Sequence, residues 1–342
     1  MKILVTGGAG FIGSNYIFFM LQTYPDVQIT NLDKLTYAGN LENLSVVERN
    51  LSYSSRYQFI KGDIVDRKLI DNLLTQGFDA VINFAAESHV DRSIEEAGIF
   101  ILTNVSGTQI LLEGVKKYKI NRFIQISTDE VYGSLGPGGK FTEESYLKPN
   151  SPYSASKASA DLICRAYFKT FNLPVIITRC SNNYGPYQFP EKVIPLFITN
   201  ALENIPLPLY GDGLNIRDWI YVEDHCRAID LVFRKGKDGE IYNIGGNCER
   251  TNIAITQTIL EKLNKPETLI TFVKDRPGHD RRYAIAADKI EKELGWKPVH
   301  SFETGIDKTI TWYLNNKSWW AQIKSGEYRN YYQRFYGNRS SL

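Results

Sequence analysis

The feature that most constrains the fold is a glycine-rich turn near the N-terminus, between an apolar run and a helical pattern. Residues 3–5 read Ile-Leu-Val, Gly7, Gly10 and Gly13 follow at intervals of three, and a helical pattern covers 11–22. A strand, a turn of this kind and a helix together bring backbone N–H groups close to a pyrophosphate. The pattern therefore predicts a nucleotide-binding α/β sheet rather than a purely structural turn.

An acidic residue at the end of the second apolar run extends this prediction. The run covers 27–32, and Asp33 follows it, about 20 residues after Gly13. A carboxylate at this position accepts a hydrogen bond from the adenosine ribose 2′-hydroxyl and repels a 2′-phosphate. The sequence therefore favours NAD over NADP.

The third and fourth apolar runs are followed by further candidates for cofactor contacts, at the same edge of the sheet. Asp63 follows the run 57–61, where it could either meet the adenine or cap the next helix. The fourth run, 80–86, ends in Ala85 and Ala86, whose small side chains let the backbone lie close to a cofactor.

Strand and helix patterns alternate up to about residue 180, which predicts an α/β fold with a doubly wound parallel Rossmann sheet. Strands are expected near 2–6, 27–32, 57–61, 79–84, 122–127 and 174–179, and helices near 11–22, 66–75, 99–118 and 153–171. Loops rich in Asn, Pro, Gly and Tyr follow and predict a smaller α/β C-terminal substrate lobe. We expect a first domain over 1–180 and a second over 181–342, with the segment 216–247 returning to the first.

Composition and charge narrow the functional classes. The 342 residues carry 40 Lys and Arg against 38 Asp and Glu, without a basic cluster, which argues against nucleic-acid or membrane-surface binding. The first strand leaves no room for a signal peptide, and no apolar run approaches the ~18 residues of a membrane span. The four cysteines and four histidines show no metal-ligand spacing, so free thiols in the cytoplasm and no metal are expected.

Two sets of acid–base groups stand between residues 127 and 157. Tyr153 and Lys157 are four residues apart in a helical pattern, so they share one face. Thr128, Asp129 and Glu130 directly follow a strand and emerge at the edge that carries the glycine turn. The first pair suits alcohol oxidation, and the acids suit a following elimination. From these residues alone, an amphipathic helix with an exposed lysine and a turn with solvated acids remain open.

These motifs together resemble the extended short-chain dehydrogenase/reductase family of sugar nucleotide-modifying enzymes. Four longer stretches resemble its dTDP-glucose 4,6-dehydratases: 84–93 (FAAESHVDRS), 127–133 (STDEVYG), 180–186 (CSNNYGP) and 275–282 (DRPGHDRR). The resemblance runs from residue 1 to about 315. It implies dehydration of dTDP-glucose to dTDP-4-keto-6-deoxyglucose by an enzyme with tightly bound NAD, as a step toward a deoxysugar such as L-rhamnose.

The resemblance also implies a role for each catalytic candidate. Tyr153 would remove the proton of the hydroxyl on carbon 4, Lys157 would favour its phenolate and hold the nicotinamide ribose, and Thr128 would bond the same oxygen. After hydride transfer, Glu130 would remove the proton on carbon 5, and Asp129 would protonate the hydroxyl leaving carbon 6. The hydride would then return to carbon 6.

Binding residues are carried over from the resemblance by position. The implied NAD contacts are Gly7, Gly10, Phe11, Ile12, Gly13, Asp33, Lys34, Leu35, Thr36, Asp63, Ile64, Ala85, Ala86, Ser88, Thr103, Tyr153, Lys157 and Asn183. The implied substrate contacts are Ser88, Thr128, Asn182, Lys192, Val193, Pro208, Tyr210, Arg217, Asn252, Arg276 and His279. Arg281 and Arg282 are expected only to pair with surface acids.

Three other functions remain compatible with the sequence. They are another NDP-sugar 4,6-dehydratase acting on UDP- or CDP-glucose, an NDP-sugar 4-epimerase, and a non-catalytic NAD-binding regulator. The Asp129–Glu130 pair argues against the epimerase, and the complete catalytic set argues against the regulator. Apolar faces on the helices near 99–118 and 153–171 are expected to pair in a homodimer. The C-terminal aromatic residues, Trp319, Trp320 and those within 328–336, either cover the nucleoside or pack on the second lobe.

Overall fold

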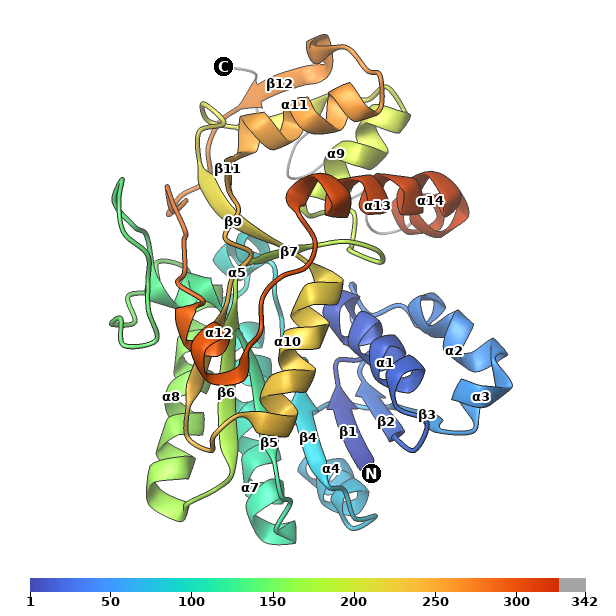
Figure 1. The fold of residues 1–342 in the computed structure, drawn as a ribbon, viewed down its shortest axis with the longest axis vertical. Helices are drawn as coiled ribbons and strands as arrows, with labels where there is room; N and C mark the ends of the chain where they lie inside the picture. The colour runs from blue at the N-terminus through green and yellow to red at the C-terminus, as the bar shows by residue number, and fades with distance from the viewer. Residues whose placement is uncertain (326–342) are drawn as a thin grey trace.

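The computed structural model describes residues 1–325, which form a larger and a smaller lobe (Figure 1). The larger lobe is built on a seven-stranded sheet in the order β10-β6-β5-β4-β1-β2-β3, with all neighbouring strands parallel. This order, with its reversal between β1 and β4, is that of a doubly wound dinucleotide-binding sheet. The predicted fold class is therefore confirmed. The aromatic residues within 328–336 lie outside the described residues.

The strands of the large sheet are short, apolar and buried. They are β1 (Lys2–Thr6), β2 (Gln28–Asp33), β3 (Tyr57–Lys61), β4 (Ala80–Asn83), β5 (Phe123–Thr128), β6 (Val175–Cys180) and β10 (Ile241–Ile244). The six strands predicted before residue 180 agree with these bounds to within one residue at each end. Helices cover both faces of a parallel sheet, so its strands appear in the sequence as continuous apolar runs.

Helices cover both faces of this sheet, as Figure 1 shows. One layer holds α1 (Phe11–Thr23) and α10 (Val222–Lys235), and the other holds α4 (Arg67–Leu74), α7 (Thr108–Tyr118) and α8 (Pro152–Phe171). Alternate residues of β1 serve the two layers, because Ile3 and Val5 pack with α1 while Leu4 packs with α4 and α7. The helix predicted near 99–118 consists of α6 (Ala97–Phe100), the π-helical η2 (Ile101–Gly107) and α7.

Short elements connect these layers, and the sequence patterns did not predict them. They are η1 (Leu41–Leu44), α2 (Ser45–Arg49), α3 (Leu51–Ser54), α5 (Val90–Glu95) and η3 (Asp129–Tyr132). Each spans too few residues for a helical period to be recognised in the sequence.

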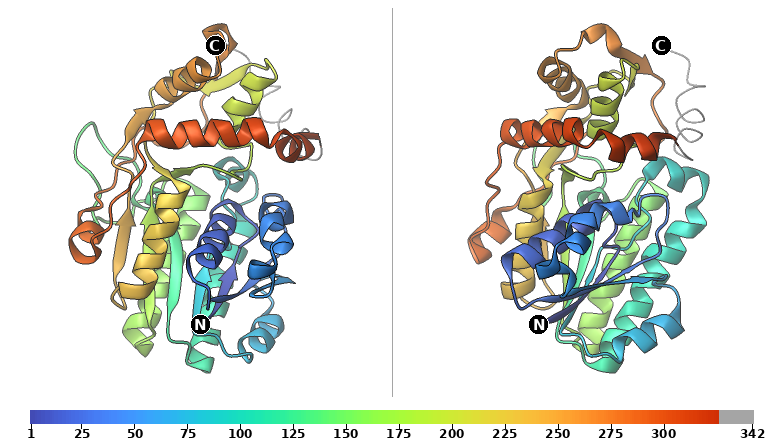
Figure 2. Two further views of the ribbon diagram at one scale, coloured as in Figure 1. Left: turned by 45° about the vertical axis from the view of Figure 1, so that its right-hand side comes forward. Right: turned by 90° about the vertical axis from the view of Figure 1, so that its right-hand side faces the viewer.

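The smaller lobe combines two small sheets with helices around a separate core that contains Phe197, Trp219 and Ile306. Its sheets are β11 (Glu249–Thr251) with β9 (Ile216–Tyr221) and β7 (Asn182–Tyr184), and β12 (Ile270–Val273) with β8 (Leu207–Tyr210). Its helices are α9 (Val193–Leu202), α11 (Asn252–Lys262), η4 (Glu267–Leu269), α13 (Phe302–Asn315) and α14 (Lys317–Ser325). In Figure 2, α13 and α14 cross between the two lobes.

The return of the chain to the larger lobe differs from the expected segment 216–247. The structure places β9 in the three-stranded sheet of the smaller lobe, between β11 and β7. The return begins with α10, which packs against α1, and ends with β10 beside β6. A further helix, α12 (Asp288–Leu294), packs against β10.

One helical stretch among the described residues is long and apolar enough to cross a membrane by length and composition alone. It covers Ala97–Tyr118, and half of its most apolar window is buried within the protein. This does not overturn the prediction that no apolar run approaches such a length, because the stretch contains Asn104, Gln109 and Glu113 and so holds no continuous apolar run of that length. Leu111 and Val115 of this stretch pack in the core beside the sheet, as expected for a core helix.

Candidate active site

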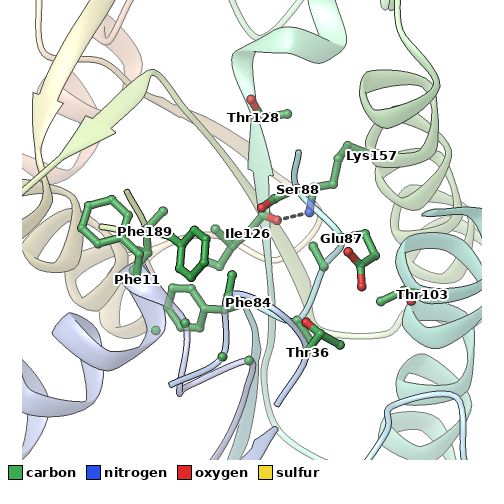
Figure 3. Close-up of a pocket in the computed structure, with 18 of the residues that line it drawn as sticks. Phe11, Thr36, Phe84, Glu87, Ser88, Thr103, Ile126, Thr128, Lys157 and Phe189 are labelled. Carbon is green, nitrogen blue, oxygen red and sulfur yellow. Dashed lines mark hydrogen bonds between the residues drawn. The ribbon is translucent and has the colours of Figure 1, made fainter. Parts of the chain in front are cut away.

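A cavity of about 320 Å³ opens at the carboxyl ends of β1, β4 and β5, where the strand order reverses. Ligands of doubly wound sheets bind at this position. In Figure 3, Phe11, Phe84 and Phe189 form one side of the cavity, and Lys157, Glu87 and Thr103 form the other. The volume lies at the lower end of the usual range for small-molecule sites.

The glycine turn leaves no room for side chains at two positions. Gly7 has a φ of +71°, and an added Cβ would lie 2.5 Å from the backbone nitrogen of Ala85. A Cβ on Gly13 would lie 2.4 Å from the carbonyl oxygen of Gly7. Gly10 caps α1 without a side-chain hydrogen bond, so the first N–H groups of this 13-residue helix have no side-chain acceptor. Free N–H groups at the positive end of a helix suit a pyrophosphate.

Asp33, the last residue of β2, lies beside this turn and holds part of its backbone. Its Oδ2 accepts a hydrogen bond from the Ala9 N–H at 2.9 Å, and its Oδ1 accepts one from the Leu35 N–H at 2.8 Å. Burial raises the pKa of Asp33, and these two bonds oppose the rise. Of the residues predicted to contact NAD, Leu35 alone does not line the cavity within the described structure.

The two interpretations of Asp63 can be compared directly. Its Oδ2 pairs with the Lys34 ammonium at 2.7 Å, and both residues line the cavity. The residue that caps α4 is Asp66, which accepts hydrogen bonds from the N–H groups of Lys68 and Leu69. The alternative that Asp63 caps the helix is therefore wrong.

Tyr153 and Lys157 lie on the first turns of α8, both buried and both facing the cavity. Ser151 and Ser154 form a reciprocal capping box at the start of this helix, which fixes where it begins. The Lys157 Nζ donates to the carbonyl oxygen of Ile126 at 2.7 Å (Figure 3). The alternative of an exposed surface lysine is therefore wrong.

Burial dominates the protonation of this pair. It raises the pKa of Tyr153 well above its ordinary value, and the negative charge of Glu130 adds to the rise, while a hydrogen bond with Thr128 opposes it. Burial also lowers the pKa of Lys157, although the charge of Asp161 on the same helix opposes this. A phenol in this environment gives up its proton only with a positive charge close by.

The two neighbouring carboxyl groups of η3 lie in different surroundings. Asp129 is buried, and its pKa is raised well above the ordinary value by burial and by the charges of Glu130 and Asp218. Burial also raises the pKa of Glu130, but the charges of Arg276, Arg217 and Lys192 lower it. The surroundings of Asp129 therefore favour its protonated form more strongly than those of Glu130 do, and the burial of both groups shows that the alternative of two solvated acids is wrong.

A second cavity, of about 160 Å³, continues from the first toward the smaller lobe. The two cavities meet at Glu130, because the residues that line both are Ser88, Glu130, Asn182, Glu191 and Lys192. The predicted substrate residues that line the second cavity are Ser88, Asn182, Lys192, Val193, Pro208, Tyr210, Arg217, Asn252, Arg276 and His279. Thr128, the remaining one, lines the first cavity.

This site can be compared with known proteins. The family model described as GDP-mannose 4,6 dehydratase matches residues 4–309. A dTDP-glucose 4,6-dehydratase from Xanthomonas campestris pv. campestris (strain B100) is 53% identical, over 95% of this chain and 97% of that protein. The chain belongs to the dTDP-glucose 4,6-dehydratase family.

Solved structures of dTDP-glucose 4,6-dehydratases agree with this membership. The enzyme from Bacillus anthracis, solved in complex with NAD, is 54% identical with a TM-score of 0.88, over 95% of this chain and all of that one. The enzyme from Streptomyces venezuelae, solved with NAD and TYD bound, is 51% identical with a TM-score of 0.91 over the same shares.

Sequence reasoning missed several polar residues of this family member's site. Glu87 and Glu191 line the first cavity, and burial raises the pKa of Glu191 to about 7. Asn104, in η2, accepts a hydrogen bond from the Glu87 N–H at 2.9 Å and donates to the Ser156 Oγ at 2.8 Å. Glu87 lies within one of the stretches that resemble the dTDP-glucose 4,6-dehydratase family, and Glu191 precedes Lys192, so their positions offered a signal.

Asp91 was missed although it joins two predicted substrate residues. Its Oδ2 accepts a hydrogen bond from the Tyr210 hydroxyl at 3.1 Å, and its Oδ1 accepts one from the Arg276 guanidinium at 3.2 Å. Arg281 pairs with the exposed Asp212, as predicted, whereas Arg282 is buried and bonds the carbonyl oxygens of Gly136 and Gly139 as well as Glu249; neither lines a cavity. Among residues 1–325, no group of three or more His, Cys, Asp or Glu side chains could hold a metal ion.

Proposed function

We propose that this protein converts dTDP-glucose to dTDP-4-keto-6-deoxyglucose and water, with NAD that stays bound through each turnover. The observation that carries this proposal is the carboxyl pair beside Tyr153: Glu130 lines both cavities, Asp129 lines the first, and the surroundings favour a proton on Asp129 more strongly than on Glu130. Epimerisation at carbon 4 involves no elimination of water, so it does not require an additional acid and base beside the tyrosine. The named activities of the relatives support the same reaction.

The residues of the first cavity fit NAD. The crowded glycine turn and the uncapped start of α1 suit its pyrophosphate, and the Asp33 carboxylate suits an adenosine ribose. When bound, NAD accepts a hydride from the sugar and gives it back. The solved relatives that contain NAD support this choice of cofactor.

The first chemical step is removal of the proton from the hydroxyl on carbon 4. Tyr153 takes this proton as carbon 4 loses a hydride, and the Thr128 hydroxyl orients the same oxygen. Because burial raises the pKa of Tyr153, the buried Lys157 ammonium one helical turn away is needed to favour the phenolate. The product of this step is a ketone at carbon 4.

The ketone acidifies the proton on carbon 5, and elimination follows. Glu130, ionised, removes this proton, while Asp129, protonated, gives its proton to the hydroxyl that leaves carbon 6 as water. The hydride then returns to carbon 6, and Glu130 returns its proton to carbon 5. Tyr153 releases the proton that it took from the carbon 4 hydroxyl, and Asp129 takes up a proton to replace the one that it gave to water, so both residues are ready for the next turnover. Two carboxyl groups with separated pKa values can divide an acid and a base role in this way.

The second cavity fits the rest of the sugar nucleotide. The cationic side chains of Lys192, Arg217 and Arg276 suit the diphosphate, and the guanidinium groups offer paired donors. Pro208 and Tyr210 also line this cavity and would flank the base. We choose thymine over uracil or cytosine because the relatives above act on dTDP-glucose.

The direct test incubates the purified protein with dTDP-glucose, without added NAD, and weighs the product by mass spectrometry. Loss of one water is the expected result, together with NAD released from the protein by acid. An unchanged mass with an altered sugar would favour the epimerase. Conversion of UDP- or CDP-glucose at a higher rate than dTDP-glucose would contradict the choice of base.

We also propose a cytoplasmic, deoxysugar-producing role with L-rhamnose as the end product, which gene deletion followed by sugar analysis would test. The four cysteines are free thiols, which suits a reducing compartment. In this proposal residues 1–180 hold NAD and residues 181–342 hold the sugar nucleotide.

A homodimer is part of this proposal. Exposed apolar side chains lie on the paired helices of the larger lobe, including Ile101 and Leu102 of η2 and Leu162 and Phe171 of α8. An exposed apolar face of this kind suits a second copy of the chain. Sedimentation of the purified protein should give a dimer, and Leu162→Arg should give a monomer.

A further inference from the structure

A segment between β2 and η1 covers one end of the first cavity. Thr36, Ala38 and Gly39 of this segment line the cavity beside Asp33. The segment begins at the Asp33–Leu35 hydrogen bond and ends where the Asn40 N–H donates to the carbonyl oxygen of Ala9 at 3.0 Å. Its two ends are therefore attached to the same glycine turn that suits the pyrophosphate.

Asn43 attaches this segment to a distant part of the chain. Its side chain is buried in η1, and its Nδ2 donates to the Ala9 carbonyl oxygen at 2.9 Å. Its Oδ1 accepts a hydrogen bond from the indole Nε1 of Trp319, also at 2.9 Å. One amide thus joins the glycine turn to α14, across 276 positions of sequence.

The indole also fixes the orientation of this amide. An indole N–H can only donate, so Trp319 must face the oxygen of Asn43. The nitrogen of the amide then faces Ala9, whose carbonyl can only accept. Without the indole, the amide is free to turn over, and the hydrogen bond that holds the end of the covering segment is weakened.

The same tryptophan also supports a second segment of the cavity wall, 187–189, whose Phe189 ring packs against Tyr37 of the covering segment. Tyr187 packs against the rings of Trp312 and Trp319, with centroids 4.7 and 6.0 Å apart. The two residues that follow Tyr187, Gln188 and Phe189, line the cavity. The Tyr313 hydroxyl donates to the Gln188 carbonyl, so α13 holds this second segment as well.

We propose that Trp319, acting through Asn43, is a positioning residue that keeps NAD from leaving the protein between turnovers and within them. The inference rests on the proposed function, in which the hydride leaves the sugar and must return from the same cofactor molecule. Loss of the reduced cofactor between these steps would leave the sugar as a ketone and the protein inactive. The crossing of α13 and α14 between the lobes (Figure 2) places their aromatic side chains against both covering segments.

The test compares NAD retention in the wild type and in Trp319→Phe, which keeps an aromatic ring but loses the N–H donor. NAD per chain is measured after dialysis, and the dissociation rate is measured by exchange against excess fluorescent etheno-NAD. We expect about tenfold faster release from Trp319→Phe, the effect of one neutral hydrogen bond. Turnover should fall in NAD-free buffer and recover in saturating NAD.

Trp296→Phe is the matched control. The Trp296 indole is also buried and donates to the Asp224 carbonyl oxygen at 3.2 Å, but it lines neither cavity. This variant should release NAD at the wild-type rate. If Trp319→Phe does not fold, Asn43→Ala tests the same hydrogen bond. If it folds, the double variant is expected to release NAD no faster than Asn43→Ala alone, because Trp319 acts through Asn43.

The outcomes separate this inference from the proposed function. If the wild type dehydrates dTDP-glucose and Trp319→Phe releases NAD as slowly as the wild type, the role of Trp319 is refuted and the function stands. Equal acceleration in Trp296→Phe would also refute it, because the effect would then be one of general stability. A wild type that neither holds NAD nor converts the sugar refutes both.

Discussion

Asp129 and Glu130 are adjacent in the chain, yet the balance of charges around them differs: Arg217 lowers the pKa of both, and Glu130 is also affected by Arg276 and Lys192. Asp129 meets the carboxylates of Glu130 and Asp218, which raise its pKa further after burial. Glu130 meets Arg276, Arg217 and Lys192, whose charges lower its pKa against the effect of burial. The sequence places the two acids side by side, but only the folded chain decides which of them keeps the proton.

This difference predicts a bell-shaped dependence of kcat on pH. Activity should be lost as pH falls through the pKa of Glu130, because the base becomes protonated, and as pH rises through the pKa of Asp129, because the acid loses its proton. Asp129→Asn should lower kcat about 10²-fold or more and flatten the alkaline limb. An alkaline limb that persists in this variant would assign it to another group.

Asp33 allows a separate prediction about the cofactor. Asp33→Asn keeps an acceptor for one of the two backbone N–H groups but loses the charge that suits a ribose hydroxyl. The dissociation constant of NAD should rise about tenfold, the effect of a charged hydrogen bond, while that of NADP should change less. Titration of cofactor-free protein with each nucleotide measures both constants. Equal weakening of the two would contradict a ribose contact.

The elements that the sequence predicted well are those whose pattern is local. Each strand of the large sheet is a continuous apolar run because both of its faces are buried, and the runs mark the strands to within one residue. The short elements η1, α5 and η3 show no period, and they carry Asn43, Asp91 and the carboxyl pair. The prediction that β9 belongs to the larger lobe was wrong because an apolar run of this kind fits a strand in either lobe. Only its pairing with β7 shows that it belongs to the smaller one.

The position of η3 depends on a hydrogen-bond network that no local pattern shows. The Tyr132 hydroxyl, at the end of η3, donates to the Asn243 Oδ1 at 2.8 Å and accepts from the Arg179 guanidinium at 2.9 Å. Arg179 in turn donates to the Asp161 carboxylate on α8 at 2.9 Å. Arg179 therefore links the element that carries the acids to the helix that carries Tyr153.

Tyr132→Phe should accordingly destabilise the protein by about 1–3 kcal/mol, because it leaves two buried polar groups short of a partner. The ring stacks on Phe141 and is retained in the variant. Urea unfolding, with NAD kept at a fixed concentration, measures the change. Tyr146→Phe is the control, since Tyr146 is 84% exposed and should be neutral. Equal stability of both variants would show that the network is dispensable.

At the scale of the whole molecule, the proposed reaction requires side chains from both lobes to meet where the two cavities join. The first cavity is formed largely by the larger lobe, whereas Arg217 and Arg276 belong to the part of the chain that follows residue 180. Asp91 of α5 spans the two, since it bonds Tyr210 of β8 and Arg276, which lies 185 positions away. Contacts over such separations leave no local pattern, which explains why Asp91 and Asn43 were not predicted while the glycine turn was.

Asp91 provides the prediction that tests this connection. Asp91→Asn keeps an acceptor for one of its two partners but loses the charge that holds Arg276. We expect KM for dTDP-glucose to rise about tenfold, because Arg276 loses the charged partner that holds it in the second cavity. The NAD content should stay unchanged, because the contacts of the cofactor cavity are not altered.

Asp212→Asn is the control, since its pair with Arg281 is half exposed on both sides and lies outside both cavities. Steady-state kinetics and acid release of NAD measure the two effects. A rise in KM that comes with loss of NAD would mean that Asp91 supports the whole site, and an unchanged KM would mean that Arg276 is held in place by its other neighbours.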